Sequence, residues 1–247
     1  MQTDYKTIKK HFEKSMANYN KNAIVQDLTA QKMVEELVKI SSDFDNILEL
    51  GSGTGLLTKK IAKNLKFHDF YANDLIEKSQ IYVEKYIPNA RFFRGNALKI
   101  KPNVKMDLII SNAMFQWFDN FEKAITAIKN SIDSSGLLVF SSFLPNNFKQ
   151  IREITGLTLN YKTEEEIKNT LKDLGFNILY CEKFSKDMEF KTPLELLAHL
   201  KNTGVNSLSE KTWTITKIRE FCEKYSQKYP TPILTYCPII FIAQLQG

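Results

Sequence analysis

The residues best suited to chemistry in this sequence are a glutamate and three alternating glycines within residues 45–58. Glu49 stands two residues before Gly51, and Gly53 and Gly55 follow at two-residue spacing. The apolar residues before the glycines suit a buried strand and those after them recur at helical spacing, so the glycines fall in a strand-to-helix turn. Glycine tolerates positive φ and lets the backbone approach a ligand, and the next helix offers free N–H groups. We predict that this turn holds a cofactor.

The acidic residue indicates what kind of cofactor this is. A carboxylate so close to the turn would sit badly beside a pyrophosphate but well beside a cationic group. The Glu-x-Gly-x-Gly-x-Gly pattern resembles motif I of the class I S-adenosylmethionine-dependent methyltransferases, whose ligand has an amino group and a sulfonium and no phosphate. The other interpretation is a glycine-rich turn without a ligand. The predicted cofactor contacts in this turn are Glu49, Gly51, Ser52, Gly53 and Gly55.

Polar residues also follow the next predicted strands. Asp74 ends a strand at residues 70–74, where an acidic residue of a nucleotide-binding unit accepts hydrogen bonds from ribose hydroxyls. The strand at residues 90–94 leads into Gly-Asn-Ala, a place where this methyltransferase class often carries Gly-Asp-Ala, whose side chain meets the adenine amino group. The amide oxygen of Asn96 can still accept from that amine. The further predicted cofactor contacts are Asp74, Leu75, Asn96, Ala97 and Asn112.

The fourth predicted strand, residues 106–112, runs into Ala-Met-Phe-Gln-Trp at 113–117. Parallel α/β sheets bind ligands at the carboxyl ends of their strands, so this edge should lie beside the methyl group. Gln116 and Trp117 are predicted positioning residues, with a helix start and a packed indole as the other interpretation. Asn112 is not followed by Pro-Pro-aromatic, the arrangement of enzymes that methylate amino groups of bases or glutamine, which counts against an N-methyltransferase.

These residues need a scaffold, and the apolar spacing predicts a Rossmann-like α/β fold. We expect one domain, residues 1–247, built on a seven-stranded, mostly parallel sheet with helices on both faces and an antiparallel last strand at the edge. The predicted strands are 47–50, 70–74, 90–94, 106–112, 136–143, 176–190 and 233–245. The predicted helices of the sheet layers are 30–41, 56–65, 121–132 and 163–175.

Two helical additions accompany this scaffold. Residues 1–42 form an N-terminal helical cap that begins with a helix at 5–23, and residues 191–232 form a helical lid inserted before the last strand. Thr192-Pro-Leu-Glu195 predicts the start of the first lid helix. Its apolar residues fall into two stripes, so we expect it to be buried on two sides.

Composition narrows the possible functions. Three cysteines without C-x-x-C spacing and three scattered histidines predict neither disulfides nor a metal site. No apolar run approaches the length of a membrane span and the N-terminus lacks a signal-peptide pattern, so we expect a cytoplasmic protein that does not act at a membrane. The net charge of +6 permits an acidic partner. It is not clustered as a nucleic-acid-binding strip would be.

Several segments together resemble one family, the malonyl-acyl carrier protein O-methyltransferases of biotin synthesis. They include Phe12–Gln26, the glycine motif and Ser-Asn-Ala-Met-Phe-Gln-Trp at 111–117. The narrowest signals are His-Leu-Lys-Asn-Thr-Gly at 199–204 and Leu-Thr-Tyr at 234–236. Where some members continue with His after Leu-Thr-Tyr, this chain has Cys237, to which we assign no role.

The resemblance implies that S-adenosylmethionine methylates the free carboxylate of a malonyl thioester, leaving S-adenosylhomocysteine. The acceptor is normally carried on an acyl carrier protein, an acidic partner. A carboxylate is already ionised at neutral pH, so the site must align it rather than deprotonate it. A cation that holds the anion is therefore expected, and Lys201 is preferred over His199 and Arg152 for this role. Possible hydrogen-bond donors to the acceptor are Tyr19, Gln116 and Tyr236.

Two other functions stay open at this point. A methyltransferase for a free small carboxylic acid such as aconitate shares the cofactor fold and a similar strand-four edge, although the insert at 191–232 argues against it. A non-catalytic S-adenosylmethionine-binding protein would keep Glu49, the three glycines and Asp74 as they are. The sequence does not distinguish a carrier protein from coenzyme A as the natural carrier of the acyl group.

Overall fold

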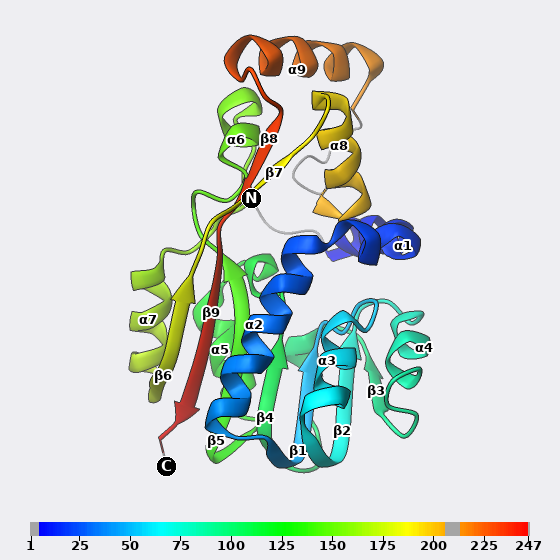
Figure 1. Cartoon of the computed structure of the whole chain (residues 1–247). Coiled ribbons are helices and arrows are strands. Elements are labelled where there is room, and N and C mark those ends of the chain that lie inside the picture. Colours follow the sequence, from blue (N-terminus) through cyan, green and yellow to red (C-terminus); the bar gives the residue numbers. More distant parts are fainter. Residues whose placement is uncertain (1–4, 206–212, 247) are drawn as a thin grey trace.

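The computed structural model describes residues 5–205 and 213–246, and its centre is a seven-stranded sheet (Figure 1). The strand order is β3-β2-β1-β4-β5-β9-β6, the first five strands are parallel, and β9 runs antiparallel to both β5 and β6. The predicted Rossmann-like sheet with an antiparallel last strand is confirmed. The strands are β1 Asp43–Leu50, β2 Lys66–Asp74, β3 Arg91–Arg94, β4 Met106–Ser111, β5 Ile132–Phe143, β6 Phe176–Lys183 and β9 Pro238–Leu245.

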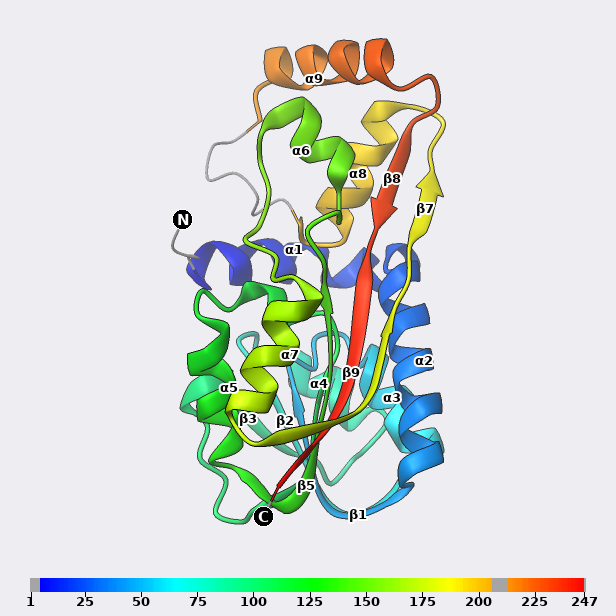
Figure 2. The ribbon, with the colours of Figure 1, turned by 90° about the vertical axis from the view of Figure 1, so that its left-hand side faces the viewer.

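Helices cover both faces of this sheet (Figure 2). On one face, α2 (Ile24–Ile40), α3 (Leu56–Asn64) and α4 (Ser79–Glu84) bury their apolar residues against the strands. On the other face, α5 (Phe121–Lys129) and α7 (Glu164–Asp173) do the same. Thr163 caps α7 in a capping box with Glu166, as the sequence predicts. Each face of the sheet therefore has its own apolar core.

The remaining elements lie beyond the carboxyl ends of the parallel strands. Helix α1 (Tyr5–Asn22) crosses this end of the sheet, and α6 (Lys149–Thr155), α8 (Pro193–Asn202) and α9 (Ile215–Lys228) lie above it (Figure 1). Strands β7 (Lys186–Glu189) and β8 (Ile233–Tyr236) pair antiparallel among them. These upper elements share a third apolar core that includes Leu196, Phe221 and Tyr236.

The last two strands differ from the prediction. Residues 176–190 and 233–245 were each expected to be one strand, but each divides into one strand in the main sheet and one in the upper hairpin. Strand β9 is also not at the edge, since it lies between β5 and β6. The physical reason is visible in its burial: Ile239 through Ala243 are all fully buried, so both faces of β9 are covered, as is typical of a central strand. The edge strand is β6, whose residues are largely exposed or half-buried.

Three expectations about helices also need correction. Helix α2 begins at Ile24 rather than Ala30, and Ile132 starts β5 instead of ending the preceding helix. Helix α8 begins at the predicted Thr192 cap but is buried on one side only: Leu196 and Leu200 are buried, whereas Leu194 is 57 % exposed. The second apolar stripe is mostly exposed: Leu194 and Ala198 face solvent, and Leu197 is half-buried at the margin of the upper core. Within the described ranges, no helix is long and apolar enough to cross a membrane.

Candidate active site

The glycine turn has the geometry that its sequence predicts. Gly51, Gly53 and Gly55 all have positive φ, at +70°, +54° and +71°. A Cβ added at Gly51 would lie 2.7 Å from the Sδ atom of Met114, and one added at Gly55 would lie 2.8 Å from the carbonyl oxygen of Tyr82. At Gly55 a side chain is therefore disfavoured by conformation and blocked by backbone, whereas at Gly51 it is disfavoured by conformation and would displace the Met114 side chain.

Glu49 points from the end of β1 into the site and is 1 % exposed. Its Oε2 accepts a hydrogen bond of 2.6 Å from the Thr58 hydroxyl in the first turn of α3. Burial raises the pKa of the Glu49 carboxyl to about 8, an effect opposed by the Thr58 hydrogen bond and reinforced by the charge of Asp74. A cationic ligand group beside Glu49 would restore the carboxylate, so this residue suits a cation.

Asp74 joins the glycine turn to the end of β2. Its Oδ2 accepts from the Gly53 N–H and its Oδ1 from the Ile76 N–H, both at 2.8 Å. Burial raises the pKa of the Asp74 carboxyl, although these backbone donors oppose the shift. Leu75 lies beside it in the site wall. Asp74 therefore orders the turn in addition to facing the space where a ligand would lie.

The residues that follow β3 and β4 already make hydrogen bonds within the protein. Asn96 caps a short 3-10 turn by accepting from the Leu98 N–H at 2.9 Å, and Ala97 follows it in the wall. Asn112 donates to the Gln26 carbonyl at 3.0 Å and accepts from the Ser141 hydroxyl at 2.7 Å. Its amide thus ties the start of α2 to β4 and β5.

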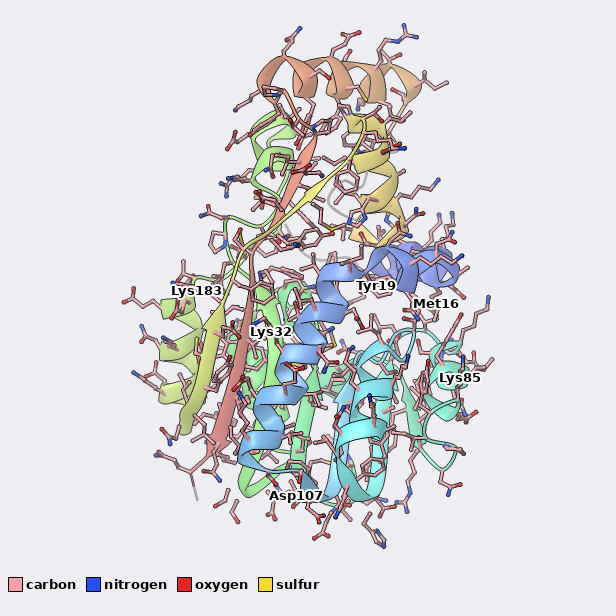
Figure 3. All side chains as sticks on the ribbon, in the orientation of Figure 1. Met16, Tyr19, Lys32, Lys85, Asp107 and Lys183 are labelled. Carbon is pink, nitrogen blue, oxygen red and sulfur yellow. The ribbon has the colours of Figure 1, made fainter. Side chains whose placement is uncertain are left out.

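Apart from Gly55, which lies behind the wall against Tyr82, the predicted cofactor residues line one chamber, here called the first chamber. Its walls come from the glycine turn, the ends of β2 and β4, the Asn96 turn and helix α1. Figure 3 shows the α1 residues Met16 and Tyr19 on the side of the helix that faces the sheet. Glu49 and Asp74 give this chamber two acidic side chains, and the Ser52 hydroxyl in its wall is buried without a hydrogen-bond partner.

A second chamber adjoins the first below the upper elements. The two share four lining residues, Phe12, Tyr19, Ala113 and Trp117. The second chamber adds mainly aromatic and neutral polar side chains, among them Gln26, Gln116, Asn147, Tyr161, Thr203 and Tyr236. Within the described ranges, none of its lining residues is a lysine, an arginine or an acid. The first chamber, with its two acidic side chains, and the neutral second chamber thus meet beside Tyr19 and Trp117.

The structure separates the residues predicted to bind the acceptor. Tyr19, Gln116, Trp117 and Tyr236 line the second chamber, and His199 lies directly behind Tyr236, with its Nε2 2.7 Å from the tyrosine oxygen. Lys201 is exposed on α8 and lines neither chamber. Arg152 lines neither chamber either, and it donates to the Pro145 carbonyl at 2.6 Å. The structure does not bring these two cations to the predicted site.

Some site residues were missed by the sequence interpretation. Thr58 holds Glu49 from one helical turn beyond the glycines, a spacing that could have identified it. Asn147 follows strand β5 in a Pro-Asn-Asn loop, and its amide contacts both the Tyr161 hydroxyl and the Cys237 N–H at 3.0 Å. A polar residue just after a central strand is a usable signal. Tyr161 itself lies in a segment without periodicity and carries no such signal.

Comparison with known proteins places the chain in a family. Residues 22–180 match the model of a methyltransferase domain. The malonyl-acyl-carrier protein O-methyltransferase of Calditerrivibrio nitroreducens is 35% identical over 240 residues, which are 96% of this chain and 95% of the relative. The enzyme of the same name from Bacteroides thetaiotaomicron is 34% identical, over 96% of this chain and 97% of the relative. The chain belongs to the malonyl-acyl-carrier protein O-methyltransferase family.

A solved structure shows the same fold at low sequence identity. The N-methyltransferase NodS from Bradyrhizobium japonicum, in complex with S-adenosyl-L-homocysteine, superposes with a TM-score of 0.58 at 10% identity and covers 98% of this chain and 100% of its own. As a member of its family, this chain is an S-adenosylmethionine-dependent O-methyltransferase. The first chamber fits that cofactor, because its glycine turn lets the ligand contact the protein backbone and Glu49 offers a carboxylate to the amino group of the ligand.

Proposed function

We propose that this protein transfers the methyl group of S-adenosylmethionine to the free carboxylate of a malonyl thioester, giving the methyl ester as an early step of biotin synthesis. One observation carries the proposal: the first chamber, lined by Glu49 and Asp74, adjoins a second, smaller chamber lined by aromatic and neutral hydrogen-bonding side chains. The two meet at Tyr19 and Trp117, where the methyl group would pass from one ligand to the other.

The chain has little acid–base chemistry to perform. S-adenosylmethionine, when bound, supplies an electrophilic methyl group. The malonyl carboxylate is a carboxylate anion at neutral pH and needs no general base. What the protein supplies is alignment of the acceptor oxygen and exclusion of water, and such positioning can contribute about 7–11 kcal/mol. Phe12 and Trp117, whose rings meet edge to face at 6.0 Å, form an apolar wall at the junction.

We propose that α1 acts as a cap and the predicted insert 191–232 as a lid over these chambers, within one domain of 247 residues. The end of α8 approaches α1 closely: a Cβ on Gly204 would lie 3.0 Å from the Phe12 ring. Gly204 has φ +74°, so glycine suits this position for two reasons. The contact joins the upper elements to the wall of both chambers.

We propose that the malonyl group arrives on an acyl carrier protein, an acidic partner, in the cytoplasm. Lys10 and Lys14 are exposed on α1 and Lys201 is exposed on the adjacent α8. Long-range attraction between these lysines and an acidic carrier would raise the association rate and would be screened by salt. The KM for malonyl carrier protein should therefore rise with ionic strength, whereas that for malonyl-coenzyme A should rise less. Equal salt dependence for both acceptors would contradict steering by the carrier.

The test of the function is a comparison of acceptors. The purified protein is incubated with methyl-labelled S-adenosylmethionine and, in separate reactions, malonyl carrier protein, malonyl-coenzyme A or free trans-aconitate. We expect label in the malonyl thioesters and little in aconitate. Preferential labelling of aconitate would reassign the protein to the small-acid methyltransferases, and binding without any labelling would indicate a non-catalytic protein.

A further inference from the structure

Among the described residues, the second chamber offers neutral hydrogen-bonding groups and no positive charge. Buried or half-buried hydroxyl, amide and indole groups make up its polar lining, and the described part of the chain places no lysine or arginine there. The imidazole of His199 lies behind Tyr236 and is 5 % exposed, and burial lowers its pKa to about 4. His199 is therefore neutral at physiological pH.

The two segments with the narrowest family resemblance meet at this point. His199 comes from α8 and Tyr236 from the end of β8, and their side chains are joined by the 2.7 Å contact between Nε2 and the phenol oxygen. Tyr236 is fully buried and lines the second chamber. If the imidazole carries its proton on Nε2, it donates to the Tyr236 oxygen, which the Thr203 and Gln26 side chains also contact. With donors from these neighbours, the Tyr236 O–H proton can point to an acceptor in the chamber.

A second donor lies where the chambers meet. Trp117 is 7 % exposed, lines both chambers, and its Nε1–H is buried without a hydrogen-bond partner. Indole nitrogen can only donate, and a buried donor left unpaired is costly, so this group calls for an acceptor atom. A ligand carboxylate oxygen at the junction would satisfy it.

We propose that the acceptor carboxylate is held by neutral donors, the Tyr236 hydroxyl and the Trp117 indole N–H, and that His199 is a positioning residue that turns the Tyr236 hydroxyl toward the substrate. This proposal rests on the proposed function. It replaces the cation expected from the sequence, because Lys201 and Arg152 both lie outside the second chamber.

Neutral donors suit a carboxylate that must react. A full ion pair with lysine or arginine would stabilise the negative charge on the carboxylate oxygen strongly and so weaken the oxygen as a nucleophile. Hydroxyl and indole donors fix the direction of the carboxylate with a smaller loss of nucleophilicity. Burial also raises the pKa of the Tyr236 and Tyr19 hydroxyls, so both stay protonated donors over the working pH range. Rotation of the buried Gln26 or Gln116 amides, whose oxygens have no partner, would present further N–H donors.

The proposal is tested by binding in the absence of turnover. Malonyl-pantetheine and acetyl-pantetheine, which lacks the carboxylate, are titrated calorimetrically into protein saturated with S-adenosylhomocysteine. In wild type the malonyl thioester should bind more tightly. In Y236F and in W117F we expect malonyl affinity to fall by roughly 10- to 100-fold, the loss of one hydrogen bond to a charged group, with little change for acetyl.

His199 is tested through Tyr236. H199L should lose malonyl affinity as Y236F does, H199Q should retain most of it because the amide still donates, and adding H199L to Y236F should have little further effect. A merely structural role would weaken both thioesters and would not be rescued by glutamine. Y229F is the matched control, since the Tyr229 hydroxyl contacts the exposed Glu153 and lines neither chamber.

The outcomes distinguish a failure of neutral-donor binding from a failure of the proposed function. If Y236F, W117F and H199L all keep the malonyl-over-acetyl preference, or if K201M abolishes it, neutral-donor binding is wrong even though the enzyme methylates malonyl thioesters. If wild type methylates no malonyl thioester, the proposed function itself fails. Thermal unfolding of each variant identifies any that do not fold, and W117F then carries the test for Y236F.

Discussion

The most informative perturbation of the cofactor chamber is the ionisation of Glu49. This carboxyl is 1 % exposed, and burial raises its pKa to about 8. Because the pKa in the folded protein is raised above its unfolded value, the group favours folding most at low pH, and this contribution is lost as the pH rises toward 8. Without cofactor, Glu49 is therefore mainly protonated at pH 7.

Cofactor binding should reverse that preference. The ammonium group of the ligand pairs with the carboxylate form, so binding releases the Glu49 proton and grows tighter as the pH rises toward 8. With a pKa of about 8, the ionised fraction rises roughly 25-fold between pH 6 and pH 7.5, and the association constant should rise by the same factor. The ligand's own amino group stays mostly protonated over this range.

The assay is calorimetric titration of S-adenosylhomocysteine at four pH values between 6 and 7.5, with wild type and E49Q. Glutamine keeps an oxygen for the Thr58 hydroxyl but does not titrate. We expect the affinity for S-adenosylhomocysteine to rise steeply with pH in wild type and only slightly in E49Q. The affinity for 5′-methylthioadenosine, which lacks the amino group, should change little with pH in either protein. An affinity that stays flat in wild type, or a slope that is unchanged in E49Q, would refute the assignment of Glu49.

Three further sets of substitutions test the glycine turn, Asp74 and Thr58. Gly55 and Gly156 have matched backbone conformations, with φ +71° and +72°, but a Cβ at Gly55 would meet the Tyr82 carbonyl oxygen at 2.8 Å and one at Gly156 would meet nothing within 4 Å. Thermal unfolding should show that G156A loses about 1–2 kcal/mol of stability and that G55A loses clearly more. Equal losses would contradict the packing argument. Asp74→Ala removes the acceptor of two backbone N–H groups and should weaken S-adenosylhomocysteine binding at least about tenfold, whereas D74N should keep part of the binding affinity. Equal affinities of the two variants in calorimetry would argue against a role of Asp74 in ordering the turn. Thr58→Val removes a hydrogen bond that lowers the pKa of the neighbouring glutamate, so the pH at which cofactor affinity levels off should move upward, and an unchanged profile would show that this bond has no effect.

The cofactor chamber could be predicted from the sequence because its parts are local. The glycine turn, Glu49 and Asp74 lie within about 25 residues of one another, and strand, turn and helix each carry their own pattern. Even Thr58, which was missed, lies within one helical turn of the glycines. Local patterns of this kind depend little on the rest of the fold.

The second chamber could not be predicted in the same way because it is built from distant segments. His199 and Tyr236 were each identified as candidates, but no local pattern shows that they contact one another. The Asn112 amide contacts Gln26, 86 residues away, and Asn147 reaches Cys237 across 90 residues. The preference for Lys201 came from the charge that the chemistry requires, and the structure places that side chain in solvent.

The position of the last strand was predictable but was misjudged. Five successive residues of β9, Ile239 to Ala243, are apolar in the sequence. A run that is apolar on both faces is typical of a central strand rather than an edge strand. The split of the same segment at Cys237 depends on pairing of β8 with β7, a contact between segments about 50 residues apart.

The most direct test of the account is the identity of the methylated product. Malonyl, succinyl and acetyl thioesters are each incubated with the protein and methyl-labelled S-adenosylmethionine, and the products are analysed by mass spectrometry. We expect one added methyl group on the malonyl thioester, located in an ester of its free carboxylate, much less on the succinyl thioester and none on the acetyl thioester. Absence of the malonyl methyl ester, or methylation of acetyl thioester to the same extent, would contradict the proposed function.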